Sequence, residues 1–409
     1  MLAELAGLRG DGGRAAELFR RAADEYVSAG LPWFAVEYEV QVAALAHQAG
    51  DPAGAERALR SALEHGGPYV EPVGRAQLHL QLAEVVGGRG EVAEAAEHAL
   101  EAAHWADEAG ESGTLGAWAR QQLGGFLLRQ GRCAEAAEVL ESALADLSAE
   151  THGDGAVVQA QWWLGDCLSE LDDHRAAAGH RLRAAEVARH WPEQQDHATL
   201  AHLAAESLSK ADLLEEAEQA YARAGELWRA LGNPAFLVRS LRARGWLALR
   251  REGGSDGARE LMAQAVRECE RALDGAADPA LRTQLANELA HTHRQFGDLL
   301  VRSAAEGDEE EAEDGAIQAA FEAALVQMSR AAALFGTLGA HGLHDRTGAE
   351  LAAGRLEADL GRAGRAAARA RAVLVAYEGA DGEDETVAAR RAEAARILGQ
   401  EEAEEAEEA

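Results

Sequence analysis

Eight times along this chain an alanine is followed four residues later by a large apolar side chain, and three residues after that by a second alanine. The large residues are Phe19, Leu59, Leu100, Leu140, Leu182, Tyr221, Met262 and Met328. The first seven are spaced 40, 41, 40, 42, 39 and 41 residues apart. A fixed period of this length is the signature of a repeat array, so we expect the chain to stack similar units along one direction.

The three residues of each triplet lie on one face of an α-helix, because positions i, i+4 and i+7 recur near the helical period. The alanines let a neighbouring helix approach closely, and the large residue fills the remaining space. A second apolar stretch precedes each triplet and is separated from it by a short break: Gly50-Asp51, Gly90-Glu91, Gly131-Arg132 and Asp172-Asp173. Each period is therefore predicted to be a helix, a tight turn and a second helix that carries the triplet.

The composition indicates an all-α chain, since alanine, glutamate, arginine and leucine dominate and only 7 of 409 residues are proline. A formal net charge of −32 opposes binding to nucleic acid or to an anionic membrane surface. No apolar run is long enough for a membrane span, and residues 1–9 lack a signal-peptide pattern. The three cysteines have no paired spacing, which is typical of a reducing compartment. We therefore expect a cytoplasmic protein.

This pattern resembles the tetratricopeptide repeat (TPR) family, in which the first helix carries Leu-Gly and the second carries Ala-x3-Phe/Tyr-x2-Ala. Ala217, Tyr221 and Ala224 match the second-helix motif. The first-helix pair is found at Leu123-Gly124 and Leu164-Gly165, and in weaker form at Leu82-Ala83 and Leu203-Ala204. The period here is about 40 rather than the usual 34 residues, of the kind found in high-GC bacterial proteins. The resemblance implies a right-handed α-α superhelix of eight to nine helix pairs.

Residues 1–378 are expected to form this solenoid, with an acidic surface insertion near 304–316. Counting back from Phe19 places Leu2 and Ala3 in the Leu-Gly positions, so the first repeat is incomplete. We therefore expect further sequence, such as an upstream domain, on the same polypeptide. Residues 379–409 are acidic and poor in large apolar side chains, which favours a frayed or disordered tail.

In the TPR family, ligand peptides lie in the concave groove formed by successive first helices. An aromatic groove with a basic end would suit a carboxylate or an acidic peptide. Tryptophans at helical spacing are also typical of a core, and the arginines would equally suit ion pairs with neighbouring glutamates. The groove positions carried over from the resemblance are Trp118, Trp162, Arg239, Arg242, Trp246 and Arg250.

Motifs for catalysis are not apparent: the sequence has no glycine-rich phosphate loop, no Gly-x-Ser-x-Gly elbow and no His-Glu-x2-His. His341, His344 and Asp345 are too few to hold a metal. We therefore expect no enzyme activity, no cofactor and no metal. The resemblance implies a scaffold that binds a protein or peptide. The alternative is a sensor or regulatory domain of a larger signalling or transcriptional regulator, binding a small peptide or metabolite.

Overall fold

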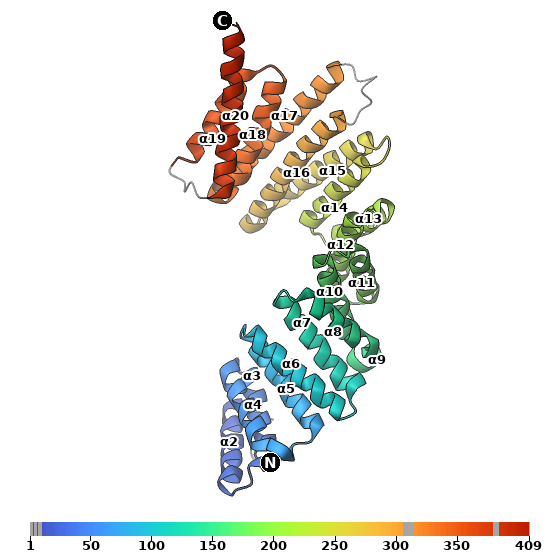
Figure 1. Ribbon diagram of the computed structural model, residues 1–409, viewed down its shortest axis with the longest axis vertical. Coiled ribbons are helices and arrows are strands. Elements are labelled where there is room, and N and C mark those ends of the chain that lie inside the picture. Colours follow the sequence, from blue (N-terminus) through green and yellow to red (C-terminus); the bar gives the residue numbers. More distant parts are fainter. Residues whose placement is uncertain (1–2, 4–5, 7–9, 306–313, 379–383, 409) are drawn as a thin grey trace. The chain divides into compact units, whose positions relative to one another are not determined.

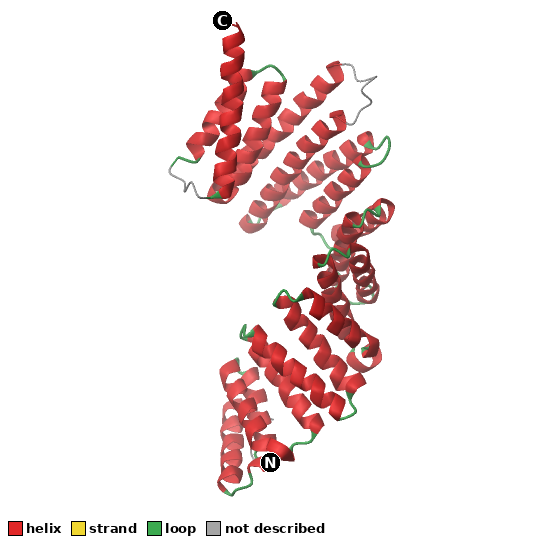
Figure 2. Cartoon of the chain, viewed as in Figure 1, coloured by secondary structure: helices red, strands yellow, loops and turns green. Residues whose placement is uncertain are grey.

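The computed structural model describes residues 3, 6, 10–305, 314–378 and 384–408, with backbone only for 314 and 400–408. These residues form helices joined by short loops, without a strand (Figures 1 and 2). None of the described helices is long and apolar enough to cross a lipid bilayer. Most of the incomplete first helix and of the acidic insertion lies outside the described residues. The chain divides into two compact units, Met1–Asp212 and Leu213–Ala409, which are treated separately below.

Unit 1 is a series of antiparallel helix pairs. The pairs are α3 with α4, α5 with α6, α7 with α8, and α10 with α11, and each packs against the next. Helix α2 precedes these pairs and α12 follows them. The helices are α2 (Gly12–Ser28), α3 (Val36–Gln48), α4 (Pro52–Gly66), α5 (Pro72–Gly88), α6 (Val92–Glu108), α7 (Ala117–Arg129), α8 (Cys133–Asp146), α9 (Ala149–His152), α10 (Asp154–Glu170), α11 (His174–Ala188) and α12 (Gln195–Lys210).

Unit 2 continues the alternation with longer helices. After α13, the pairs are α14 with α15, α16 with α17, and α18 with α19, followed by α20. The helices are α13 (Leu214–Ala230), α14 (Pro234–Leu249), α15 (Ser255–Gly275), α16 (Pro279–Ala305), α17 (Asp314–Thr337), α18 (Leu343–Asp359), α19 (Ala363–Ala376) and α20 (Glu385–Glu408).

The turns inside the pairs lie where the sequence predicts them. Gly50 ends α3 with a φ of +73°, and the amide of Asp51 donates to the carbonyl of Ala46 at 2.9 Å. This is the hydrogen bond that closes a helix through a left-handed residue, a conformation that favours glycine. Between α10 and α11, Asp172 takes this conformation instead, with a φ of +61°. The four predicted turns are therefore confirmed.

The large residue of the second helix packs directly against the first helix of its own pair. Leu140 of α8 is completely buried, and a Cβ on Gly124 of α7 would lie only 2.4 Å from its Cγ. In the same way, a Cβ on Gly297 of α16 would lie only 2.9 Å from Cε of Met328 in α17. The Leu-Gly glycine is thus required because the facing side chain occupies the space of its Cβ.

Two members of the predicted triplet series are wrong by one residue. Leu100 is 58% exposed and Leu182 is 42% exposed, whereas the adjacent Ala99 and Arg181 are buried. With these two in the large-residue position, the series from Phe19 to Met262 is spaced by 40 or 41 residues throughout. The sequence could not decide between the registers, because consecutive alanines on both helices satisfy the triplet pattern in either one.

Arg181 occupies a position that holds an apolar side chain in most other pairs. A Cβ on Gly165 of α10 would lie 2.8 Å from its Cγ, so its aliphatic stem fills the space. Its guanidinium donates to Asp166 at 2.7 Å, to the Ser207 hydroxyl at 2.5 Å and to the Leu203 carbonyl at 3.3 Å. The stem supplies packing while the charged head is paired, which makes the burial of an arginine tolerable.

The C-terminal segment differs from the expected frayed or disordered tail. Residues 385–408 form α20, which packs on α18 and α19. Val387, Ala394 and Ile397 of α20 are buried in a cluster with Leu351 and Tyr377. Because positions 387, 394 and 397 share one helical face, a few small apolar residues suffice to dock an otherwise acidic helix.

Candidate functional site

Successive first helices of unit 1 enclose two adjoining cavities. One, of about 190 Å³, lies among α3, α4 and α5. The other, of about 330 Å³, lies between α5 and α7. Both are lined by Gln81 and Glu84, so the two cavities adjoin at α5. We call this surface the first-helix groove; it is lined mainly by Val40, Ala44, His47, Gln77, Leu80, Gln81, Glu84, Trp118 and Gln122.

Equivalent positions of α5 and α7 supply the polar and aromatic side chains of this groove. Gln77 and Trp118 both lie five residues before the leucine of the Leu-Gly pair, and Gln81 and Gln122 both lie one residue before it. Trp118 is 38% exposed, so its ring is available to a ligand while part of it packs against the protein. The structure therefore places Trp118 in a groove.

Trp162 lies at a different helical offset from Trp118. It is two residues before Leu164, the position that Gln121 holds in α7, and Gln121 is only 2% exposed. Trp162 packs against a buried cluster that includes Ala184 and Leu200. Of the two alternatives for this tryptophan, its position favours the core.

Two of the three arginines that were expected in a basic groove, Arg239 and Arg242 of α14, are engaged with Glu288 of α16. Arg242 is 8% exposed and donates to the Glu288 carboxylate at 3.1 Å and to the Thr292 hydroxyl at 3.1 Å. Arg239 donates to the same carboxylate at 2.9 Å and stacks on Phe236. Burial lowers the pKa of the Arg242 guanidinium, and the Glu288 carboxylate opposes that effect. These ion pairs favour the alternative in which the arginines hold helices together.

The remaining predicted residues of α14 are also partly committed to packing. The indole nitrogen of Trp246 donates to Gln295 of α16 at 3.2 Å, and its ring packs on a buried cluster around Met262. Arg244, next to these positions, pairs with Glu218 at 2.8 Å. Arg250 is exposed at the C-terminal end of α14. These side chains belong to unit 2, whereas Trp118 belongs to unit 1.

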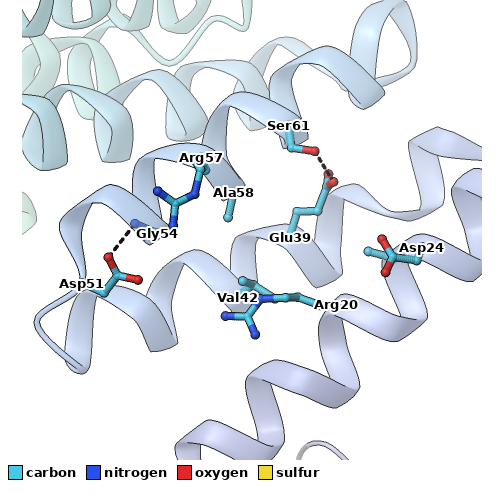
Figure 3. A pocket seen from close by; sticks show the side chains of 10 residues that line it. Arg20, Asp24, Glu39, Val42, Asp51, Gly54, Arg57, Ala58 and Ser61 are labelled. Atoms are coloured by element: carbon cyan, nitrogen blue, oxygen red, sulfur yellow. Dashed lines mark hydrogen bonds between the residues drawn. The ribbon is translucent and has the colours of Figure 1, made fainter.

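A separate polar cavity of about 260 Å³ lies among α2, α3 and α4 (Figure 3). Helix α2 contributes Arg20 and Asp24, α3 contributes Glu39, and α4 contributes Arg57 and Ser61. The remaining lining residues are Ala23, Val42, Asp51, Gly54 and Ala58. The cavity thus combines charges of both signs with a small apolar wall.

Glu39 is the most buried charged residue of this cavity, at 8% exposure. Its Oε1 accepts from the Ser61 hydroxyl at 2.5 Å and lies 2.8 Å from Nδ1 of His65. Nδ1 of His65 also lies 3.4 Å from the Ser61 hydroxyl, so one ring nitrogen faces both serine and acid, whereas in a nucleophilic triad the two ring nitrogens contact them separately. The arrangement is suited to fixing the carboxylate, and not to activating Ser61.

The glutamines of the groove and the cavity at Glu39 were not identified from the sequence. Gln77 could have been identified, because it lies five residues before Leu82, just as Trp118 lies five residues before Leu123. No comparable signal exists for Glu39, because its cavity depends on how three helices pack around it. A buried glutamate cannot be told from a solvated one by its position in a helical pattern.

Comparisons with known proteins give no family at the level of sequence. No protein-family model matches the chain, and no curated protein matches it. Among solved structures, BtubC from P. vanneervenii is 21% identical over 55% of this chain and 90% of its own, with a TM-score of 0.44. The C-terminal part of a TPR repeat-containing protein from Cytophaga hutchinsonii is 12% identical over 65% and 98%, with a TM-score of 0.48. PilF of Pseudomonas aeruginosa is 22% identical over 62% and 97%, with a TM-score of 0.40.

Because these identities and TM-scores are low, no further property is inferred from the similarities. The fold is assigned from the chain's own geometry. From Phe19 to Met262 the large-residue position recurs every 40 or 41 residues, and the turns at Gly50, Gly90, Gly131 and Asp172 pass through a left-handed residue. In two of the pairs, Leu140 and Met328 of the second helix occupy the space that a Cβ on Gly124 or Gly297 of the first helix would need. The chain therefore has a TPR-like, all-α repeat fold.

Proposed function

We propose that unit 1 is a non-catalytic scaffold that binds an extended segment of a partner protein in the first-helix groove. The observation that carries this proposal is the pair of adjoining cavities on α3, α5 and α7, with the partly exposed Trp118 lining one of them. Preformed, partly apolar concavities with a few polar groups are the usual form of a binding site.

The side chains of the groove suit the backbone of an extended peptide. Each glutamine amide can both donate and accept, as can each peptide unit of the ligand. Gln77, Gln81 and Gln122 therefore provide a row of partners that does not depend on the ligand's side chains. Trp118 adds a large, rigid contact area, which is typical of residues that dominate binding energy at interfaces.

The charge of the groove favours a neutral or basic ligand. Glu84 lines both cavities, and the chain as a whole carries −32. Arg239 and Arg242, which were expected to give a positive end, lie in unit 2 and share the single carboxylate of Glu288. A basic segment would be attracted by the field of the protein, whereas an acidic peptide would be repelled.

Selection from a random phage-displayed peptide library on the full-length chain would test this function. We expect enrichment of uncharged or basic peptides, and an affinity about tenfold or more weaker for Trp118→Ala, as for a central aromatic contact. Tyr69→Ala is the matched control, since Tyr69 is 64% exposed but lies outside the groove. Equal losses in both variants, or no loss for Trp118→Ala, would exclude the groove.

A sensor or regulatory domain is the second candidate. The observation that favours it is the polar cavity at Glu39, whose volume of about 260 Å³ is below the range of about 300–1,000 Å³ typical of sites for drug-sized ligands. Such a cavity suits a small metabolite and not a peptide chain.

A further inference from the structure

Only one of the two carboxylate oxygens of Glu39 forms hydrogen bonds. Oε1 receives the bonds from Ser61 and His65, whereas Oε2 is buried and has no hydrogen-bond partner within the described part of the chain. A buried carboxylate oxygen without a donor is costly, because the interior does not replace the hydrogen bonds lost from water. A ligand with a positively charged donor would supply the missing bond.

The opposite charge is available on the same cavity wall. Arg20 and Arg57 both line the cavity, from α2 and α4, and neither forms an ion pair with another described residue. Figure 3 shows these two side chains on either side of the hollow that Glu39 also borders. Guanidinium groups are well suited to bind a carboxylate through two parallel hydrogen bonds.

The apolar part of the wall limits the rest of the ligand. Ala23, Val42 and Ala58 contribute small aliphatic surfaces, and the volume of about 260 Å³ leaves room for few atoms. A metal ion is not favoured, because no three histidine, cysteine or carboxylate side chains among the described residues converge closely enough to hold one. The lining therefore matches a small molecule with an ammonium, a carboxylate and a short aliphatic group.

We propose that the cavity among α2, α3 and α4 binds a small aliphatic α-amino acid. Its ammonium group bonds to Oε2 of Glu39, its carboxylate pairs with Arg57 and Arg20, and its side chain lies against Val42. Because Oε2 has almost no exposed surface, binding of the ammonium group requires the side chains that cover this oxygen to shift. The site is distinct from the first-helix groove and does not depend on peptide binding there.

Isothermal titration calorimetry with L-valine, isobutylamine and 3-methylbutanoate tests this assignment on the full-length chain. The last two compounds each keep one of the charges of L-valine and the same branched carbon chain. We expect L-valine to bind at least about tenfold more tightly than either, because each lacks one charge-assisted hydrogen-bonding group. Isobutylamine binding as tightly as L-valine, or no binding of any of the twenty common amino acids at millimolar concentration, would overturn the proposal.

Two variants locate the site. Glu39→Gln and Arg57→Gln should each weaken L-valine binding about tenfold or more, since each removes one charged partner. Glu97→Gln is the matched control, because Glu97 is exposed on α6 and does not line the cavity. If Glu39→Gln disturbs folding, as judged by circular dichroism, the affinity of Arg57→Gln for L-valine tests the site by itself, because Arg57 is exposed. Unchanged affinity in Arg57→Gln would then contradict the site.

Discussion

Leucine-to-alanine substitutions at Leu140 and Leu100 distinguish residues that are equivalent in the sequence pattern but not in the structure. Leu140 is completely buried against Gly124, whereas Leu100 is 58% exposed on α6. A buried leucine truncated to alanine costs about 2–5 kcal/mol, depending on how far the surroundings can collapse. We expect Leu140→Ala to lie in the upper half of this range, because Gly124 has no side chain with which to fill the cavity.

For Leu100→Ala we expect a change in the free energy of unfolding within about 0.5 kcal/mol, since an exposed leucine contributes little and alanine is the better helix former. The assay is urea denaturation followed by circular dichroism. Hydrogen exchange should accompany it, because repeat arrays can unfold in parts. The amides of α7 and α8 should lose protection in Leu140→Ala only. Equal destabilisation by the two substitutions would refute the register assigned here.

Three other predictions concern packing, ion pairing and pH. Ala143→Arg should lower stability by about 3 kcal/mol or more through overpacking, because Ala143 is completely buried, and an unchanged melting temperature would contradict this. Glu288→Gln should cost about 3 kcal/mol, because it leaves the buried Arg242 without its countercharge. The control Glu218→Gln should cost about 1 kcal/mol or less, because that pair is more exposed, and similar costs for the two would argue against the buried pair. Burial lowers the pKa of His180 to about 4 from its ordinary 6.5, so the folded state binds fewer protons between these values and stability should fall as the pH drops through that window. In His180→Gln the urea midpoint should change less between about pH 7 and pH 5, and an identical change in both proteins would exclude this role.

The repeat period, the helix pairs and the tight turns could be predicted from sequence because each depends on local residue types. The glycine at Gly50 and the aspartate at Asp172 mark turns whatever the rest of the chain does. The register of α6 and α11 could not be predicted in the same way. Neighbouring alanines satisfy the triplet pattern twice, and only contacts with the preceding helix decide which alanine is buried.

The candidate site was harder to predict than the fold. Trp118 lines a cavity of the structure, whereas Trp162, two residues rather than five before its leucine, packs against a buried cluster. Arg242 looked like part of a basic patch because Glu288 lies 46 residues further along the chain. A helical pattern shows which residues share a face, but it does not show which distant side chain neutralises them.

The docking of α20 could not be predicted from the sequence either. Its sequence is rich in glutamate, and the few apolar side chains appear too sparse to hold it. Val387 and Ile397 nevertheless align on one face, opposite a surface of α18 and α19 that already exists. Composition describes the average of a segment, whereas docking depends on the residues of one face.

Disulfide trapping across one helix pair tests the central claim, the register of the repeat, most directly. In a background with the native cysteines replaced by alanine, Gly165→Cys combined with Arg181→Cys should form a disulfide, because a Cβ on Gly165 lies 2.8 Å from the Cγ of Arg181. Gly165→Cys combined with Leu182→Cys should remain reduced, since the side chain of Leu182 points to the solvent side of α11. Formation of the second disulfide and not the first would contradict the account.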